Sequence, residues 1–317
     1  MSTPDNEPPW ERQLLEKVAF AALHEQRAKR RWGIFFKLAG LTYLVAVLVL
    51  VVDWGGAEQR ADGRHTAVIH LHGTIEAQGE ASAQNVNDAL EAAFADKGTA
   101  GVILRVNSPG GSPVQAGIVH DEIRRLRTKH PQIPLYAVVE DLCASGGYYV
   151  AVAADKIFVD KASIVGSIGV LMDGFGFTGT MDKLGVERRL LTAGENKGFL
   201  DPFSPQDAKQ KEHARVLLRE IHKQFIEVVR RGRGTRLKET PEMFSGLMWT
   251  GSQSISLGLA DGLGTVGSVA RDVIKAERIV EFTIKENIAE RFAKRLRADA
   301  AQGMTGTLLG FSQTLFH

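Results

Sequence analysis

The sequence has little cysteine and little imbalance of charge. Cys143 is the single cysteine among 317 residues, so the chain can form no internal disulfide. Neither a Cys/His cluster with zinc-site spacing nor a Walker loop occurs. The formal net charge is +2 with both signs interspersed, which gives no indication of a nucleic-acid partner. We therefore expect no metal, no other cofactor and no nucleic acid.

One long apolar run is present, at residues 32–54 (WGIFFKLAGLTYLVAVLVLVVDW). About 20 apolar residues span a bilayer core of roughly 30 Å. Trp32 and Trp54 bracket the run as interfacial aromatic residues do, and Lys37 lies near enough to its start to snorkel. Four basic residues between positions 27 and 31 precede the run, whereas acidic residues follow it. The positive-inside rule then predicts a single-pass anchor in the inner (cytoplasmic) membrane, with a cytoplasmic N-terminus and a periplasmic or otherwise extracytoplasmic body.

Two other interpretations of this run stay open. A cleavable signal peptide has a shorter leader and an A-x-A-like site, neither of which is present. A buried core helix is the second alternative. Around the anchor we expect an amphipathic cytoplasmic leader (1–31), a polar linker (55–65) and a C-terminal extension (281–317) that is partly mobile.

The body, residues 66–280, reads as one α/β domain. Apolar strand-like runs begin near residues 66, 101, 134, 156 and 164, and helical patterns occupy 83–95, 113–129, the run from Ser145 to Ala154, and 205–231. A further helix closes the domain near residue 275. Alternation of strands and helices predicts a largely parallel sheet, whose functional groups gather at the carboxyl ends of the strands.

Two glycine-bearing turns lie at such strand ends. In SPGG (108–111), Pro109 fixes φ and two glycines let the backbone approach a ligand, while N–H groups ahead of a helix favour an anion such as an oxyanion. Taken alone, this motif favours a plain tight turn. Ser145 in CASGG starts a helix, so it is either a helix N-cap or an exposed nucleophile.

A serine nucleophile needs a base. None of the nine histidines lies in a glycine-rich or otherwise site-like stretch. Lysine is an alternative base where burial lowers its pKa. The candidate is Lys197, in GENKGFLDPF, with glycines on both sides and apolar residues after it. A surface lysine in a loop is the alternative interpretation.

Four motifs in order resemble the signal peptide peptidase A (SppA) family of membrane-anchored Ser/Lys peptidases: LRVNSPGGSP (104–113), CASGGYYVA (143–151), ASIVGSIGV (162–170) and GENKGFLDPFSP (194–205). LGLADGLG (257–264) also fits. The resemblance implies a Clp-protease/crotonase-like α/β core and cleavage of signal peptides or other apolar peptides at the membrane. It makes Ser145 the nucleophile, Lys197 the general base, Gly111 and Gly146 the oxyanion hole, and Ser167 the hydroxyl that orients the lysine.

A single copy of the motif set is typical of short members of the family, which assemble into homo-oligomers where Ser and Lys can come from different subunits. Cys143, two residues before Ser145, is interpreted as packing rather than as the nucleophile. The long leader leaves open a distinct subgroup, such as the SohB-like peptidases. A crotonase-like acyl-CoA enzyme and a non-catalytic membrane scaffold on the same fold are the rival interpretations.

Overall fold

The computed structural model describes residues 10–51 and 63–284. The chain divides into two units, one of residues 1–58 with 286–317 and the other of residues 59–285. In the first unit the described residues form one helix of 42 residues, α1 (Trp10–Val51), which runs without a break from the predicted leader into the predicted span.

Among residues 10–51 and 63–284, no helix has both the length and the hydropathy that a membrane crossing requires. Residues 52–54 of the predicted span, most of the predicted linker and nearly all of the predicted C-terminal extension lie outside the described residues. The membrane anchor and the orientation of the chain therefore stay predictions.

The second unit alternates strands and helices, as its sequence pattern predicts. Its elements are β1 (His65–His72), α2 (Ala83–Ala95), β2 (Thr99–Ser108), α3 (Pro113–Lys129), β3 (Leu135–Ala144), α4 (Gly146–Ala151), β4 (Lys156–Val159), β5 (Ile164–Gly166), α5 (Thr178–Leu184), α6 (Ala208–Arg233), the 3₁₀ turn η2 (Gly234–Arg236), β6 (Met248–Thr250), α7 (Gly251–Ser256), β7 (Gly262–Leu263), α8 (Val266–Ser268), the π-helical turn η3 (Val269–Ile274) and β8 (Ile279–Glu281).

The strands form one mixed sheet that is largely parallel, which confirms the predicted fold class at this level. Its order is β6-β5-β3-β2-β1-β8, and β5 with β6 is the antiparallel pair. β3 is shared: its first half pairs with β4 and its last residues pair with β5. This fork places the end of β3 between β2 and β5.

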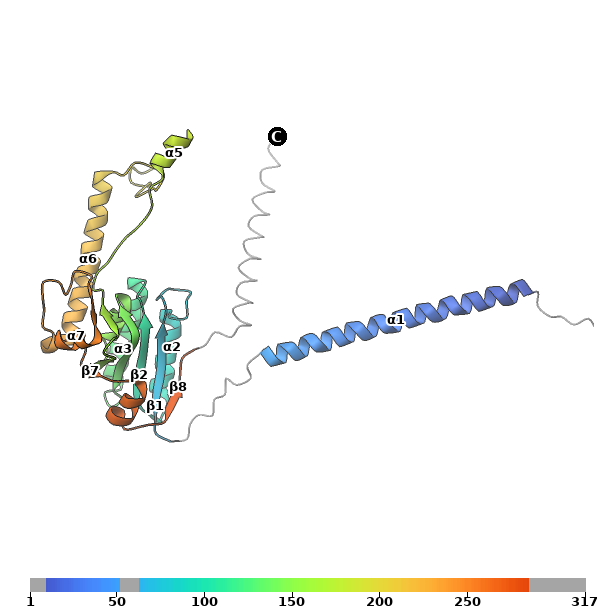
Figure 1. Cartoon of the computed structure of the whole chain (residues 1–317), viewed down its shortest axis with the longest axis horizontal. Helices are drawn as coiled ribbons and strands as arrows, with labels where there is room; N and C mark the ends of the chain where they lie inside the picture. The colour runs from blue at the N-terminus through green and yellow to red at the C-terminus, as the bar shows by residue number, and fades with distance from the viewer. Residues whose placement is uncertain (1–9, 52–62, 285–317) are drawn as a thin grey trace, which may run out of the picture. The chain divides into compact units, whose positions relative to one another are not determined.

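The two faces of the sheet are covered differently. On one face α2, α3, α4 and α6 pack on alternate strand residues such as Ile69, Leu104 and Ala137, which are fully buried (Figure 1). On the other face the turn of η3 packs on Val68, Ile103 and Val138. The period-two alternation in β1 to β3 supplies both apolar faces, as a sheet covered on both sides requires.

Local signals explain where the elements start and stop. Ser82 and Ser112 cap α2 and α3 by accepting an N–H from the first turn, and Pro113 occupies the first turn of α3. The strand predicted from residue 164 is shorter than expected and ends at Gly166, because Gly166 and Ser167 both have positive φ. The helix after Ser145 likewise ends at Ala151 rather than Ala154.

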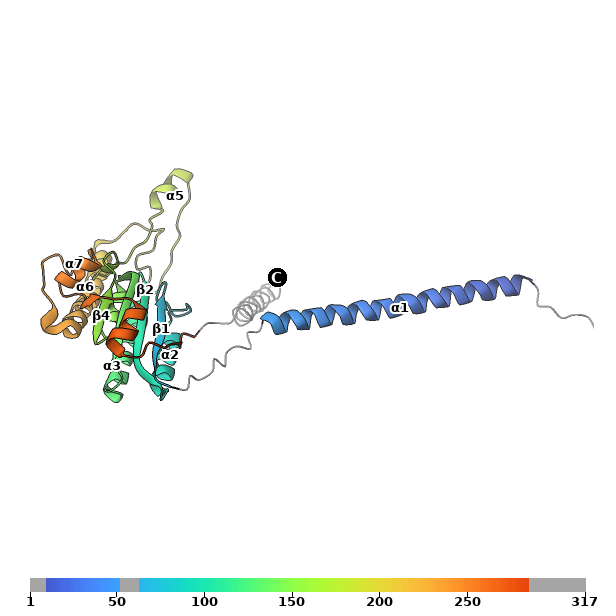
Figure 2. The same ribbon diagram turned by 60° about the horizontal axis from the view of Figure 1, so that its bottom comes forward.

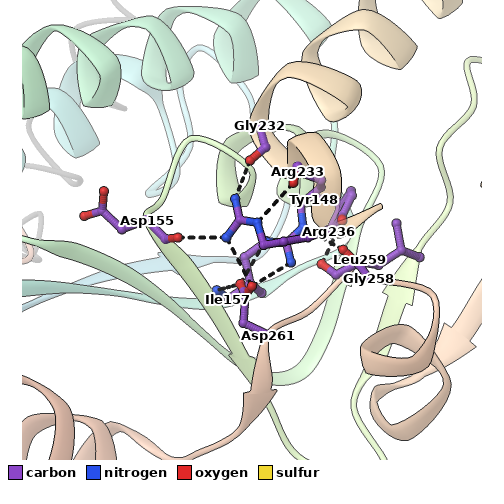
Figure 3. Close-up of polar contacts among 9 residues, drawn as sticks. All are labelled: Tyr148, Asp155, Ile157, Gly232, Arg233, Arg236, Gly258, Leu259 and Asp261. Atoms are coloured by element: carbon purple, nitrogen blue, oxygen red, sulfur yellow. Dashed lines mark hydrogen bonds and ion pairs between the residues drawn. The ribbon is translucent and has the colours of Figure 1, made fainter. Parts of the chain in front are cut away.

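A buried ion pair fixes the last turn of α6 to the end of the sheet (Figure 3). Arg233, 1% exposed, contacts both carboxylate oxygens of Asp261 at 2.8 and 2.9 Å and donates from Nε to the Gly258 carbonyl at 2.8 Å. Asp261 also accepts the Ile157 N–H at 2.7 Å. Burial alone would raise the pKa of Asp261, but the bonds from Arg233 and from Ile157 N–H hold it below the ordinary value.

Replacing Asp261 by Asn should lower the free energy of unfolding by about 3–5 kcal/mol, because the change leaves a buried guanidinium without its charge partner. Since the native pKa is lowered, this stability is present above the ordinary carboxyl pKa and is lost as pH falls. As the pH falls below about 4, the urea concentration at the unfolding midpoint should therefore decrease for the wild type, and it should decrease less for Asp261→Asn. Urea unfolding of the full chain followed by tryptophan fluorescence measures both. Asp272→Asn is the control, because the Arg271–Asp272 pair is exposed; equal losses in the two variants would contradict the role of the buried pair.

Candidate active site

Three strand ends converge where the sequence predicts functional groups. Ser108 at the end of β2 is paired with Cys143 in β3, and Ala144 in β3 is paired with Gly166 in β5. The SPGG turn, Ser145 and Ser167 follow these three ends directly. The structure therefore brings four of the five predicted site residues to one edge of the sheet, namely Gly111, Ser145, Gly146 and Ser167.

Ser145 occupies a strained turn between β3 and α4. Its φ of 51° with ψ of −123° is a conformation that costs a non-glycine residue about 1–3 kcal/mol. Its side chain makes no capping hydrogen bond to α4, so the interpretation of Ser145 as a side-chain N-cap is wrong. Its N–H donates to the Gly166 carbonyl at 2.8 Å. The turn thus leaves a half-buried hydroxyl without a role in the helix.

The glycine turn packs directly on this serine. A Cβ on Gly110, whose φ is 97°, would stand 2.6 Å from the Gly146 nitrogen and 2.7 Å from the Ser145 Cβ. The point where a Gly146 Cβ would stand lies 3.3 Å from the Gly111 nitrogen. Within residues 63–284 neither the Gly111 nor the Gly146 N–H donates to a protein acceptor. Two donors beside a serine hydroxyl are the elements of an oxyanion site.

Ser108 orders the glycine turn, a role that the sequence analysis missed. Its fully buried hydroxyl donates to the Gly73 carbonyl at 2.6 Å and accepts the Gly110 N–H at 3.1 Å. The second bond is a local Ser turn, which the NSPGG pattern is able to indicate. The first depends on a residue 35 positions away and leaves no local signal.

Ser167 also has an unusual backbone, with a φ of 52°. Its N–H donates to the Leu247 carbonyl at 2.7 Å, and its own carbonyl accepts the Gly169 N–H at 2.9 Å. Because Ser145 bonds to the residue before it, Ser167 is fixed next to the strained turn. Its side chain is half-buried.

Lys197 is the predicted site residue that the chain does not bring to this edge. Its side chain is exposed and forms no hydrogen bond or ion pair within the described residues. Its segment packs on the first turns of α6, since the Phe199 ring lies 5.7 Å from that of His213 and Leu200 N–H donates to Gln210. Figures 1 and 2 show the segment around α5 extending away from the sheet.

The length of α6 sets this separation. His222 of α6 contacts the Ile168 carbonyl beside Ser167 at 3.2 Å, whereas His213, nine residues earlier, contacts the Lys197 segment. Nine residues of α-helix span about 14 Å. The Lys197 segment therefore contacts α6 more than two helical turns before the residue that reaches the backbone beside Ser167.

Other candidate nucleophiles and bases do not enter the site. Cys143 is fully buried and burial raises its pKa, so the interpretation of this residue as packing is confirmed. Within the described ranges, no hydrogen bond joins the Ser145 hydroxyl to a histidine, a lysine or a carboxylate. The part of the chain that is described also holds no group of three or more His, Cys, Asp or Glu side chains that could bind a metal ion.

A hollow of about 660 Å³ lies elsewhere on the sheet. It is lined by side chains that include Arg105, Glu140, Asp160 and Val266. None of the five predicted site residues lines it. We assign no reaction to this hollow, because Ser145 and the two N–H donors lie at the strand ends.

A serine in a strained strand-to-helix turn beside two unpaired N–H groups is characteristic of hydrolases that act through a tetrahedral intermediate. Residues 127–279 match the model of peptidase family S49. A putative signal peptide peptidase SppA of Enterococcus faecium is 29% identical over 240 residues, which cover 72% of this chain and 68% of that protein. A putative protease of Methanocaldococcus jannaschii is 33% identical over 208 residues, which cover 64% of this chain and 65% of that protein.

The match over residues 127–279 and the names of these relatives support an SppA/SohB-like serine peptidase of family S49. A Brucella abortus protein named Na(+)/H(+) antiporter NhaA is 46% identical over 217 residues, which cover 67% of this chain. This chain spans 29% of the length of that relative. The match therefore gives no ground for assigning ion transport to this chain.

The closeness of Gly110 to Ser145 makes a testable prediction. Gly110→Ala should unfold at a lower temperature than the wild type and lose reaction of Ser145 with a fluorophosphonate probe, because the added methyl meets Gly146 N and Ser145 Cβ and because φ is positive. Gly117→Ala on α3 is the matched control, since open space surrounds that position and alanine favours helix by up to about 1 kcal/mol. A Gly110→Ala protein as stable and as reactive as Gly117→Ala would show that this contact does not constrain the site.

Proposed function

We propose that this protein is a membrane-anchored serine endopeptidase in which Ser145 is the nucleophile and Lys197 of a neighbouring subunit is the general base. The observation that carries the proposal is the strained Ser145 turn, with two N–H donors beside it and no base bonded to its hydroxyl from the described residues of its own chain. The match of residues 127–279 to peptidase family S49 supports peptide hydrolysis as the reaction. The fold is then the Clp-protease/crotonase-like core expected for the family.

The supply of lysine by a second subunit explains why Lys197 is presented outward. The Lys197 segment packs on α6 and leaves its amine free of contacts within the described residues. The same segment exposes large apolar side chains, with Leu191 96% and Phe175 82% exposed. Exposed apolar side chains of this size mark a surface that another protein surface covers. A closed homo-oligomer buries it and completes each active site at the same time.

The reaction follows from these positions. Lys197 Nζ accepts the proton of Ser145 Oγ while Oγ forms a bond to the peptide carbonyl carbon, and the carbonyl electrons move to the oxygen. Gly111 and Gly146 N–H groups donate to that oxyanion. On collapse the C–N bond breaks, the lysine returns the proton to the leaving amine, and water hydrolyses the remaining ester by the reverse sequence. Ser167 Oγ orients the lysine amine through a hydrogen bond and does not transfer a proton to it.

The proposed substrates are cleaved signal peptides and other apolar peptides at the membrane. The name of the Enterococcus relative supports this class, as does the apolar run at residues 32–54 that would hold the body near a membrane. We place the catalytic unit on the periplasmic or extracytoplasmic side from the charge asymmetry around that run. An acyl-CoA enzyme on the same core finds no such support among the relatives.

The test uses detergent-solubilised full-length protein and a fluorogenic apolar peptide near pH 8. Ser145→Ala and Lys197→Ala should each lower activity by at least about a thousandfold while remaining folded and assembled. Lys209→Ala, an exposed lysine on α6, is the matched control and should keep wild-type activity. A fully active Ser145→Ala protein would exclude the serine mechanism.

Mixing the two inactive variants tests the origin of the lysine. When Ser145→Ala and Lys197→Ala subunits are co-assembled in equal amounts, about a quarter of the sites in a head-to-tail ring combine an intact serine with an intact lysine. Activity should return to about that fraction of the wild-type rate. A mixture that stays inactive, although both variants co-purify, would assign the two residues to the same subunit.

A further inference from the structure

We infer that His222 is a positioning residue of this active site: it holds the Ile168 carbonyl and thereby fixes Ser167. This inference rests on the proposed function, because the importance of Ser167 there comes from its orientation of the lysine. The observation behind it is separate. It is a hydrogen bond of 3.2 Å from an α6 side chain to the backbone next to the site.

The Ile168 carbonyl needs this partner. Ile168 is fully buried and lies after the end of β5, outside any strand or helix. The backbone hydrogen bonds of residues 63–284 give its carbonyl no backbone donor. A buried carbonyl without a donor costs about 1–3 kcal/mol. The imidazole Nε2–H therefore supplies the hydrogen bond that no backbone N–H of residues 63–284 provides.

The Ile168 carbonyl belongs to the Ile168–Gly169 peptide, whose N–H donates to the carbonyl of the strained residue, Ser167, at 2.9 Å. Ser167, with a φ of 52°, is held on its N-terminal side by the bond to Leu247 and on its C-terminal side by the Gly169 turn. Without a donor at the Ile168 carbonyl, the Ile168–Gly169 peptide is free to rotate, and the Ser167 backbone, which the Gly169 N–H holds at its carbonyl, is free to shift with it. The Ser167 side chain would turn with it, because its direction is set by that backbone.

The packing of α6 on α4 holds His222 in place for this contact. Three residues beyond His222, on the same face, Phe225 is buried and its ring lies 5.2 Å from that of Tyr149 in α4. Farther along the helix, a Cβ on Gly232 would overlap the Val152 carbonyl at the end of α4. His222 is therefore fixed relative to the helix that begins directly after Ser145, and it transmits that position to Ser167.

Two substitutions separate hydrogen bonding from packing. His222→Leu keeps an apolar body but removes the donor, whereas the amide nitrogen of His222→Gln reaches a similar position to Nε2. Lys223→Leu is the matched control, because Lys223 is the exposed neighbour on α6 and its side chain has no hydrogen bond or ion pair within the described residues. The three full-length variants and Ser145→Ala are compared with the wild type on the fluorogenic apolar peptide, after thermal melts confirm that each is folded.

We expect His222→Leu to lower kcat by about 10- to 100-fold with KM close to wild type, because the substrate still binds but the base is poorly oriented. His222→Gln should recover most of kcat, and Lys223→Leu should match the wild type. A His222→Leu protein with wild-type kcat, or a His222→Gln protein as slow as His222→Leu, would overturn the inference. Full activity in Ser145→Ala would instead overturn the proposed function.

A measurement independent of activity tests the contact itself. In ¹⁵N-labelled Ser145→Ala protein, long-range ¹H–¹⁵N spectra assigned through His222→Gln should show a proton on Nε2 of His222 that exchanges slowly at neutral pH. The donor role requires that proton. A neutral imidazole with Nε2 unprotonated would exclude the hydrogen bond to Ile168 and overturn the inference.

Discussion

The close approach of Gly110 to the Ser145–Gly146 peptide is the constraint on which the site depends. A side chain at Gly110 would overlap this peptide, and the Gly111 N–H is placed beside Gly146 by the same contact. The parallel register of β2 with β3 brings the two turns together, and the buried Ser108 hydroxyl holds the glycine turn in shape. The strain at Ser145 persists because its neighbours on both sides leave the chain no relaxed alternative.

α6 connects this constraint to the rest of the molecule. Its last turn is tied to the sheet through Arg233 and Asp261, its middle contacts Ile168 through His222, and its first turns carry the segment of Lys197. From Gln210 to Arg233 the helix spans about 35 Å. One helix therefore fixes the position of the Lys197 segment relative to the Ser145 site of the same chain. Under the proposed function, the chain supplies this lysine to a neighbouring subunit.

Much of this arrangement could be predicted from the sequence, and the remainder could not for identifiable reasons. The strands, the helices and the position of Ser145 follow from local alternation, caps and glycine turns, and motif order led to Gly111, Gly146 and Ser167. The bonds from Ser108 to Gly73 and from His222 to Ile168 join residues 35 and 54 positions apart, so no local pattern marks these two contacts. The separation of Lys197 from Ser145 depends on the path of α6, which spacing along the chain does not encode.

The division of labour between fold and assembly has a physical logic. Strain at Ser145 and the two N–H donors are properties of one chain, since they follow from contacts made within residues 63–284. A hydroxyl without a base is a poor nucleophile at neutral pH, whatever its backbone conformation. If the lysine comes from a neighbour, an unassembled chain carries a preorganised but inert serine. Catalysis then begins when the exposed apolar segment around Leu191 is buried, so the contact that completes the site is also the one that removes the apolar surface from water.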